Sequence, residues 1–411
     1  MKTSCSARAI FIFLLMALFL CFEMALQVSP GVMTADLSSS LHLTSFSLGL
    51  MSGVYFITYS LMQIPSGLMF DRLNIVKVVC TAIFLCSVGA GLFGLSHSFV
   101  EAVLARLLMG FGSAFAFISV LTAAARYLPS PYFAMLAGVA QLLAAIGAIG
   151  GALPITWLNQ TFGWRHSFLG FMVFGFALMA LVIFTFRNMD TACKTPPQNE
   201  QVKHSLREIL KNPQTWLIGF YAFFNWAPIT AFASLWGVPF LMTKYGFSLT
   251  LSASLISLIW LGVGLSSPFI GALSDRIKRR KPLLILTALL GAAAIAIIIY
   301  APTLPVVILG ALLFVTGLGA SGQVLSFAVV KDYTEHKRSS AAIGFNNMAV
   351  VASGVVMQPL IGKLIELNGT PSAGALYSLD SFMHSLYILP LCYIMCVLIA
   401  LIFIKETYRT S

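Results

Sequence analysis

Two charged side chains lie inside long apolar stretches of this sequence. Glu23 is near the end of the stretch 9–29, and Arg106 lies within the stretch 100–126. A charge inside a lipid bilayer is costly, faces the interior of a helix bundle and usually serves a solute or proton pathway. Because the two residues lie at a similar depth, we expect a Glu23–Arg106 pair whose carboxyl takes up and releases a proton. A static pair that only orients the first helix is the alternative.

Further side chains in the apolar stretches could bind a solute through hydrogen bonds or ring contacts. They are Gln27, Tyr55, Tyr59, Gln141, Asn225, Trp226, Gln323 and Asn346. Gln27 follows Glu23 by one helical turn and shares its face. Asn225 and Trp226 precede Pro228, and a helix break there would free backbone groups. Polar side chains also join membrane helices to one another, and the sequence leaves both roles open.

The sequence holds no arrangement typical of an enzyme or a metal site. The apolar stretches contain no Ser/His/Asp set, no paired carboxylates and no cluster of His and Cys. We therefore expect no catalytic residues, no metal and no cofactor. The partners expected are a small-molecule solute, protons and the lipid bilayer.

Composition indicates the elements that must position these residues. The chain is 59% hydrophobic and 9% charged, whereas about a quarter of the residues of soluble domains are charged. A spanning helix needs about 20 apolar residues, and the apolar runs are continuous rather than alternating, which excludes a transmembrane barrel. The sequence predicts an all-α integral membrane protein with twelve transmembrane helices. They are 9–29, 46–69, 75–96, 100–126, 134–157, 166–186, 215–239, 249–272, 282–301, 304–329, 339–366 and 383–404.

The basic residues predict the orientation of these helices. Of the 24 Lys and Arg residues, all but Arg106, Arg165, Lys244 and Lys363 fall at connections on one side. Basic residues are retained on the cytoplasmic side, so we expect both termini and the polar segment 187–214 in the cytoplasm. This excess of basic residues in cytoplasmic loops is enough to explain the net charge of +11. Nucleic-acid binding is not expected, because apolar helices separate the basic loops.

A short pattern occurs twice, each time between two predicted spans. Its copies are Gly67-Leu-Met-Phe-Asp71-Arg72 and Gly271-Ala-Leu-Ser-Asp275-Arg276. They are separated by about half the chain length, which predicts two similar halves of six helices, an architecture of solute transporters. We assign the halves to 1–186 and 215–411, with a cytoplasmic linker at 187–214.

The repeated pattern has a physical interpretation as a cytoplasmic gate. We expect Gly67 and Gly271 to let a neighbouring helix approach closely. The acids Asp71 and Asp275 are placed to face a helix N-terminus or an Arg. The pattern would then form a latch between the halves. The alternative for its Arg residues is that they serve only the orientation.

The pattern resembles one in the major facilitator superfamily, whose loops between helices 2 and 3 and helices 8 and 9 carry it. The segment Arg106-Leu-Leu-Met-Gly110-Phe-Gly112 is similar to the fourth-helix motif of that superfamily, and Arg126 to the Arg that pairs with the loop Asp. The resemblance implies two pseudo-symmetric bundles around a central cavity at which helices 1 and 4 meet. Gly147-Ala-Ile-Gly150-Gly151 resembles the antiporter motif of helix 5, but Ala148 replaces its Pro, which argues against drug or proton antiport.

Two further resemblances concern the cargo. The segment 22–33 is similar to the first helix of the phagosomal-transporter branch, found in bacteria that grow inside host cells, and the whole chain more distantly resembles lysosomal dipeptide transporters. They imply uptake of an amino acid or short peptide across a bacterial cytoplasmic (inner) membrane by alternating access. Proton symport is a further hypothesis, and we expect a functional monomer. A siderophore or drug/metabolite exporter of the same superfamily is the alternative.

Overall fold

The computed structural model describes residues 7–128, 133–187, 210–333, 339–369 and 378–407. Their regular elements are all helical, because a chain in a bilayer must satisfy its backbone N–H and C=O groups within each segment. The N-terminal half contains seven helices and one 3₁₀ turn. They are α1 (Ala7–Val28), η1 (Ser29–Val32), α2 (Thr34–Ser40), α3 (Ser45–Arg72), α4 (Ile75–Gly94), α5 (Phe99–Ser113), α6 (Ala116–Tyr127) and α7 (Phe133–Phe186).

The C-terminal half repeats this arrangement, with two π-helical segments. Its elements are α9 (Pro213–Pro228), η3 (Ile229–Trp236), α10 (Gly237–Tyr245), α11 (Leu249–Ile277), α12 (Lys281–Tyr300), α13 (Val306–Ala320), α14 (Gly322–Asp332), α15 (Ser339–Asn368), α16 (Leu379–Ser385), α17 (Ile388–Leu398) and η5 (Ile399–Phe403). Most of the predicted linker, residues 188–209, lies outside the described residues.

Eleven helices in the described part of the chain are long and apolar enough to cross a membrane. One of them, Gly138–Phe186, has 49 residues and belongs to α7, which contains both the fifth and the sixth predicted spans. Gly163 interrupts it with a φ of 79° and a ψ of 162°, a conformation that glycine adopts without strain. The twelve predicted spans are therefore confirmed.

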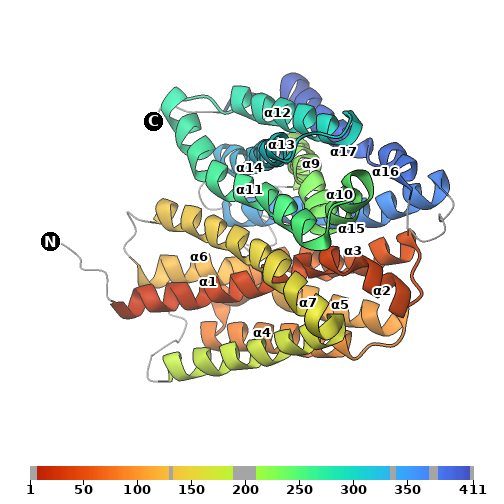
Figure 1. Cartoon of the computed structure of the whole chain (residues 1–411). Coiled ribbons are helices and arrows are strands. Elements are labelled where there is room, and N and C mark those ends of the chain that lie inside the picture. Colours follow the sequence, from red (N-terminus) through yellow and green to blue (C-terminus); the bar gives the residue numbers. More distant parts are fainter. Residues whose placement is uncertain (1–6, 129–132, 188–209, 334–338, 370–377, 408–411) are drawn as a thin grey trace.

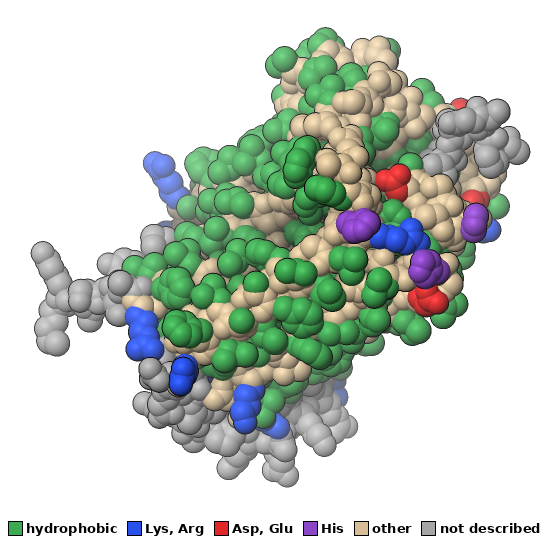
Figure 2. All heavy atoms as spheres, turned by 60° about the horizontal axis from the view of Figure 1, so that its bottom comes forward, with side chains coloured by type: hydrophobic (Ala, Val, Ile, Leu, Met, Phe, Trp, Pro, Cys, Tyr) green, Lys and Arg blue, Asp and Glu red, His purple; other side chains and the backbone are tan. Residues whose placement is uncertain are grey.

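Both termini lie at the same end of the helix bundle, on the left of Figure 1. We call this end the terminal face, and the opposite end, where α2 and α16 lie, the distal face. Figure 2 shows a broad band of apolar side chains between two ends, one with Lys and Arg side chains and the other with acidic and His side chains beside a few Lys and Arg. This distribution fits a protein that spans a bilayer. The cytoplasmic location of the terminal face stays a prediction.

Glycines allow equivalent helices of each half to touch. A Cβ atom at Gly110 of α5 would overlap the carbonyl oxygen of Tyr55 in α3. A Cβ atom at Gly317 of α13 would likewise overlap the carbonyl oxygen of Ile259 in α11. Gly110 and Gly317 are separated by nearly the same number of residues as the two copies of the loop pattern, so the internal repeat extends into the helix packing.

The two halves meet mainly through α3 with α15 and α7 with α11. Near the distal face, the backbone of Gly49 lies against the carbonyl of Gln358, and that of Gly362 against the carbonyl of Ser45. Side chains larger than hydrogen would separate the helices at these points. The halves are thus in direct backbone contact at this end.

Candidate functional site

A cavity lies between the two halves, with walls from α1, α3, α6 and α7 on one side and α9, η3, α11, α14 and α15 on the other. Its volume is about 80 Å³, below the roughly 300–1,000 Å³ of sites that enclose drug-sized ligands. Among the described residues that line it, none carries a formal charge. The polar ones are Gln27, Tyr59, Gln141, Thr230, Gln323 and Asn347.

Five of the predicted solute contacts are in the cavity wall. They are Gln27, Tyr59, Gln141, Trp226 and Gln323. The wall also includes Trp260, whose ring centroid is 6.4 Å from that of Trp226. The cavity thus combines amide groups, which both donate and accept hydrogen bonds, with aromatic faces.

The other three predicted contacts lie outside the cavity lining, where they join helices. Asn225 donates to the carbonyl of Gly319 at 3.1 Å, and Asn346 donates to the hydroxyl of Ser326 at 2.8 Å. Tyr55 is fully buried and faces Glu23 instead. Interhelical hydrogen bonds are a common use of such side chains in membranes, and here they engage the amide nitrogens of both Asn residues and the hydroxyl of Tyr55.

Thr230, Trp260 and Asn347 line the cavity although they were not among the predicted solute contacts. Asn347 shares its helix face with Val350 and Val351 of the cavity wall, at the three- and four-residue spacing of one face. Asn346 is rotated by about 100° from it. That spacing was the signal that could have identified Asn347.

Polar contacts connect the halves beside the cavity. Asn347 donates to Gln63 Oε1 at 2.6 Å, and the hydroxyl of Ser60 donates to the carbonyl of Met348 at 3.1 Å. Both contacts join α3 to α15. A change in the relative position of the halves along this seam must break or exchange these bonds.

Glu23 lies on the cavity side of α1 and is fully buried. Leu20 and Gln27, about one turn before and one turn after it, line the cavity, whereas Glu23 itself is not part of the lining. The hydroxyl of Tyr55 donates to Glu23 Oε1 at 2.8 Å, whereas no group in the described part of the chain binds Oε2. The carboxyl is therefore held at one oxygen only.

Arg106 is also fully buried and binds backbone carbonyls of two helices. Its Nη1 donates to the carbonyl of Leu26 at 2.9 Å, and its Nη2 to the carbonyl of Ser52 at 3.4 Å. Pro30 has no N–H, so the carbonyl of Leu26, four residues earlier, lacks its helical donor. Arg106 and the hydroxyl of Ser29, at 3.3 Å, take that place. Arg106 thus fixes the bend at the end of α1.

The expected direct ion pair between Glu23 and Arg106 is not formed in this structure. The guanidinium nitrogens of Arg106 and the carboxyl oxygens of Glu23 are more than 4.0 Å apart. The ion pairs found among the described residues all have shorter nitrogen–oxygen distances. Tyr55 connects them instead, because its hydroxyl binds Glu23 and its ring lies under the guanidinium, with 4.4 Å between Cζ and the ring centroid. The prediction placed both charges in one cluster but missed the side chain between them.

The gate residues of the N-terminal half lie near the terminal face. Arg126 at the end of α6 donates to the carbonyl of Phe70, next to Asp71, whose side chain lies outside the described part of the structure. Arg72 Nε is buried and has no hydrogen-bond partner within the described part of the structure. The prediction that Arg126 pairs with Asp71 therefore stays a prediction.

The two gate glycines do not have the expected role in this conformation. A Cβ atom at Gly67 or at Gly271 would have no other atom within 4 Å. Close helix contact occurs instead at positions such as Gly110 and Gly317, where a backbone carbonyl lies opposite. A glycine allows a second helix to come close, but close contact forms only where a neighbouring helix passes that position.

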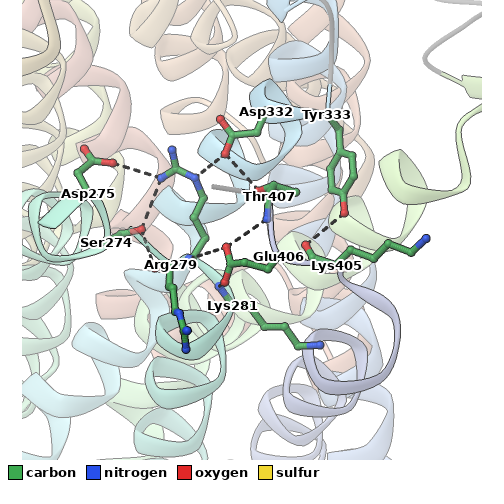
Figure 3. A network of polar contacts seen from close by, with 10 residues as sticks. Ser274, Asp275, Arg279, Lys281, Asp332, Tyr333, Lys405, Glu406 and Thr407 are labelled. Atoms are coloured by element: carbon green, nitrogen blue, oxygen red, sulfur yellow. Dashed lines mark hydrogen bonds and ion pairs between the residues drawn. The ribbon is translucent and has the colours of Figure 1, made fainter. Parts of the chain in front are cut away.

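In the C-terminal half, Asp275 belongs to a polar network at the terminal face, shown in Figure 3. Arg280 lies 3.5 Å from Asp275 and donates through Nε to Asp332 Oδ2 at 2.6 Å. Glu406 accepts hydrogen bonds from the backbone N–H groups of Arg280 and Lys281 at 2.9 and 3.1 Å. The base that binds Asp275 is thus Arg280 rather than the adjacent, exposed Arg276, and the network ties the segment after η5 to the start of α12.

Comparison with known proteins agrees with this arrangement. The chain is 29% identical to the putative transporter AraJ of Escherichia coli over half the length of each protein. It is 24% identical to the hexuronate transporter of Bacillus subtilis over 86% of each. A bacterial homologue of the human lysosomal transporter Spinster, in an inward-facing conformation, has a TM-score of 0.75 at 16% identity over 96% of this chain and 97% of that one.

The family model of the Major Facilitator Superfamily matches residues 13–357 and 237–410. These matches cover the cavity and its walls in both halves. Together with the helical fold, they identify the chain as a multi-pass secondary transporter that belongs to the Major Facilitator Superfamily.

Proposed function

We propose that this transporter takes up a small polar solute without net charge, an amino acid or short peptide, together with protons. The proposal rests on the lining of the cavity, which contains amide groups and aromatic rings. None of its described residues has a formal charge. An unpaired charge in such a site is costly. A zwitterion brings its own balance of charges.

The cavity wall offers a suitable environment for both groups of a zwitterion. Trp226 and Trp260 present aromatic faces, which attract an ammonium group through cation–π interactions. Gln27, Gln141 and Gln323 carry amide N–H groups that can donate to a carboxylate. The small volume supports a small solute over a siderophore or a bulky drug.

A sugar acid is the second candidate, and the likeness to the hexuronate transporter favours it. The hydroxyl groups of such a solute would also match the amides of the cavity. Its carboxylate would need a counter-charge, and a co-transported proton on the solute or the protein would supply one. The two candidates therefore differ in the presence of the ammonium group.

The proton site of the proposal is Glu23, one layer behind the cavity wall. Its carboxyl can exchange a proton when the cavity opens alternately to the two sides of a bacterial cytoplasmic membrane. We propose that the terminal face is the cytoplasmic one and that a single chain performs the cycle.

The test is uptake by purified protein in proteoliposomes, with labelled amino acids, dipeptides and glucuronate, each with and without an inward proton gradient. Accumulation of an amino acid or dipeptide is the expected result, and Gln141→Ala should reduce it while protein-free liposomes show none. Accumulation of glucuronate alone would replace the first candidate by the second. If no solute of the panel accumulates, the proposed uptake is wrong.

A further inference from the structure

Tyr55 is the residue that Glu23 and Arg106 share. It lies on α3, Glu23 on α1 and Arg106 on α5, and all three side chains are fully buried. The hydroxyl of Tyr55 donates to Glu23 Oε1 at 2.8 Å, and the Arg106 guanidinium lies 4.4 Å from the ring centroid. One aromatic side chain thus contacts both charged groups at once.

The two charged groups keep one unused atom each. Glu23 Oε2 and Arg106 Nε are buried and have no hydrogen-bond partner among the described residues. Leaving such groups unsatisfied costs free energy, and a direct pair would satisfy both. The hydroxyl bond to Glu23 and the ring against Arg106 oppose that pairing.

We propose that Tyr55 is the positioning residue of the proton site, which holds Glu23 by one oxygen, leaves the other for proton exchange and keeps the carboxyl apart from Arg106. This inference rests on the proton-coupled uptake proposed above. The proton exchanged is the one on Glu23 Oε2, taken from one aqueous side and returned to the other, and Tyr55 keeps its own proton throughout.

The groups around Glu23 leave Tyr55 as its only hydrogen-bond donor among the described residues. Arg106 faces it from α5, Tyr59 from α3, Cys86 from α4 and Cys21 from α1. Of the other two helices packed against α1, α6 carries its titratable side chains, Arg126 and Tyr127, at its far end, and α7 approaches through glycines with no titratable side chain there among its described residues. These glycines are Gly147, opposite Cys21, and Gly151, opposite Ala25.

The glycine contacts also explain the helix-5 motif, whose Pro is absent. A Cβ atom at Gly147 would lie 2.5 Å from the Cα of Cys21, and one at Gly151 would lie 2.6 Å from the Cα of Ala25. Their hydrogen side chains let α7 pack closely against the face of α1 that carries Cys21 and Ala25. Glu23 lies on another face of α1, and its carboxyl is turned to Tyr55 of α3.

The decisive variant is Tyr55→Phe, which removes only the hydroxyl and keeps the ring against Arg106. The matched control is Tyr393→Phe, because Tyr393 is also fully buried and its hydroxyl also donates one hydrogen bond, to the carbonyl of Thr316 at 3.1 Å. Both variants lose one buried hydrogen bond. Only Tyr55→Phe removes a donor to Glu23.

The measurement is a pH titration of the infrared band of the protonated carboxyl, with protein in lipid nanodiscs and no solute. The signal that disappears in Glu23→Gln belongs to Glu23. In Tyr55→Phe we expect its pH midpoint to move upward by about one unit, because the carboxylate loses a hydrogen-bond donor. Glu23→Asp, which withdraws the carboxyl from Tyr55, should move the midpoint as well, and Tyr393→Phe should leave it in place.

A second measurement links this positioning to transport. In proteoliposomes, Tyr55→Phe should reduce accumulation driven by a proton gradient at least fivefold more than it reduces exchange of labelled for unlabelled solute. A midpoint that stays at the wild-type value in both Tyr55→Phe and Glu23→Asp would overturn the positioning role. Failure of the wild-type protein to accumulate any solute would instead overturn the proposed function, since the infrared titration needs no solute.

Discussion

Glu366 Oε1 accepts a hydrogen bond from the backbone N–H of Phe46 at 2.9 Å, so a carboxylate of the C-terminal half caps the first turn of a helix in the N-terminal half. A carboxylate at a helix N-terminus binds otherwise unpaired N–H groups and the positive end of the helix dipole. Lys363 lies 3.5 Å from Glu366 and over the ring of Phe46, at 5.7 Å from its centroid. The halves can separate at the distal face only after this cap is broken.

Glu366→Ala should shift the protein toward states in which the distal face is open. Loss of a helix cap costs about 1 kcal/mol, which corresponds to roughly a fivefold change in the ratio of closed to open states. Distances between spin labels at the distal ends of α3 and α15 will measure that ratio. The control is Asp380→Ala, since Asp380 is an exposed acid that pairs with His384 in its own half. Equal distance distributions for the two variants would contradict the prediction.

Arg106→Lys should destabilise the protein and impair transport, although the positive charge is kept. A single ammonium cannot reproduce the planar guanidinium that reaches the carbonyls of Leu26 and Ser52 together. We expect a loss of about 1–3 kcal/mol, the cost of leaving a buried carbonyl unpaired, measured as a lower melting temperature in detergent. Arg165→Lys is the comparison, because Arg165 reaches one carbonyl, that of Ser96. An equal or smaller effect at Arg106 would argue against its role at the α1 bend.

Gly110→Ala and Gly317→Ala should both destabilise the helix packing, because the new Cβ meets a backbone carbonyl that cannot rotate away. Overpacking of this kind costs roughly 1–3 kcal/mol. Gly67→Ala and Gly271→Ala are matched controls with open space around the new atom, and we expect little change. Melting temperatures of the four variants test this, and a control as unstable as the packing variants would show that the helix backbone rather than the contact is responsible.

Arg280→Ala should loosen the segment that follows η5, whereas Arg276→Ala should not. Arg280 binds Asp332, which also accepts a hydrogen bond from Thr407 at 3.1 Å. Removing a charged partner from such a group costs roughly 1–3 kcal/mol. Hydrogen exchange of the amides of residues 404–407 should become faster in Arg280→Ala and stay at the wild-type rate in Arg276→Ala. Faster exchange in both variants would assign the effect to net charge alone.

Much of the fold follows from the sequence because the thickness of a bilayer sets the length of each span. The predicted ends agree with the helices to within a few residues in most spans, for example 75–96 against Ile75–Gly94 of α4. The boundary between the fifth and sixth spans depends on one residue, Gly163, whose conformation the composition does not reveal. The division into domains remains a prediction.

The site was harder to predict, because it depends on how each helix is rotated about its axis. The similar depths of Glu23 and Arg106 along their spans predicted that the two side chains lie close together. In the structure, Tyr55 of a third helix lies between them. Asn346 was predicted as a cavity residue, and the cavity wall holds the adjacent Asn347, which lies on a different helix face. Packing of neighbouring helices sets these rotations.

The contacts of Gly110 and Gly317 show what the two halves have in common and where they differ. Both halves keep the glycine contact, but Tyr55 of the first half corresponds to Ile259 of the second at that contact. The helix contact is thus common to both halves, whereas the tyrosine that binds Glu23 has an aliphatic counterpart in the second half. Under the proposed function, exchange of the second half between relatives would leave Glu23 and its hydroxyl donor in place.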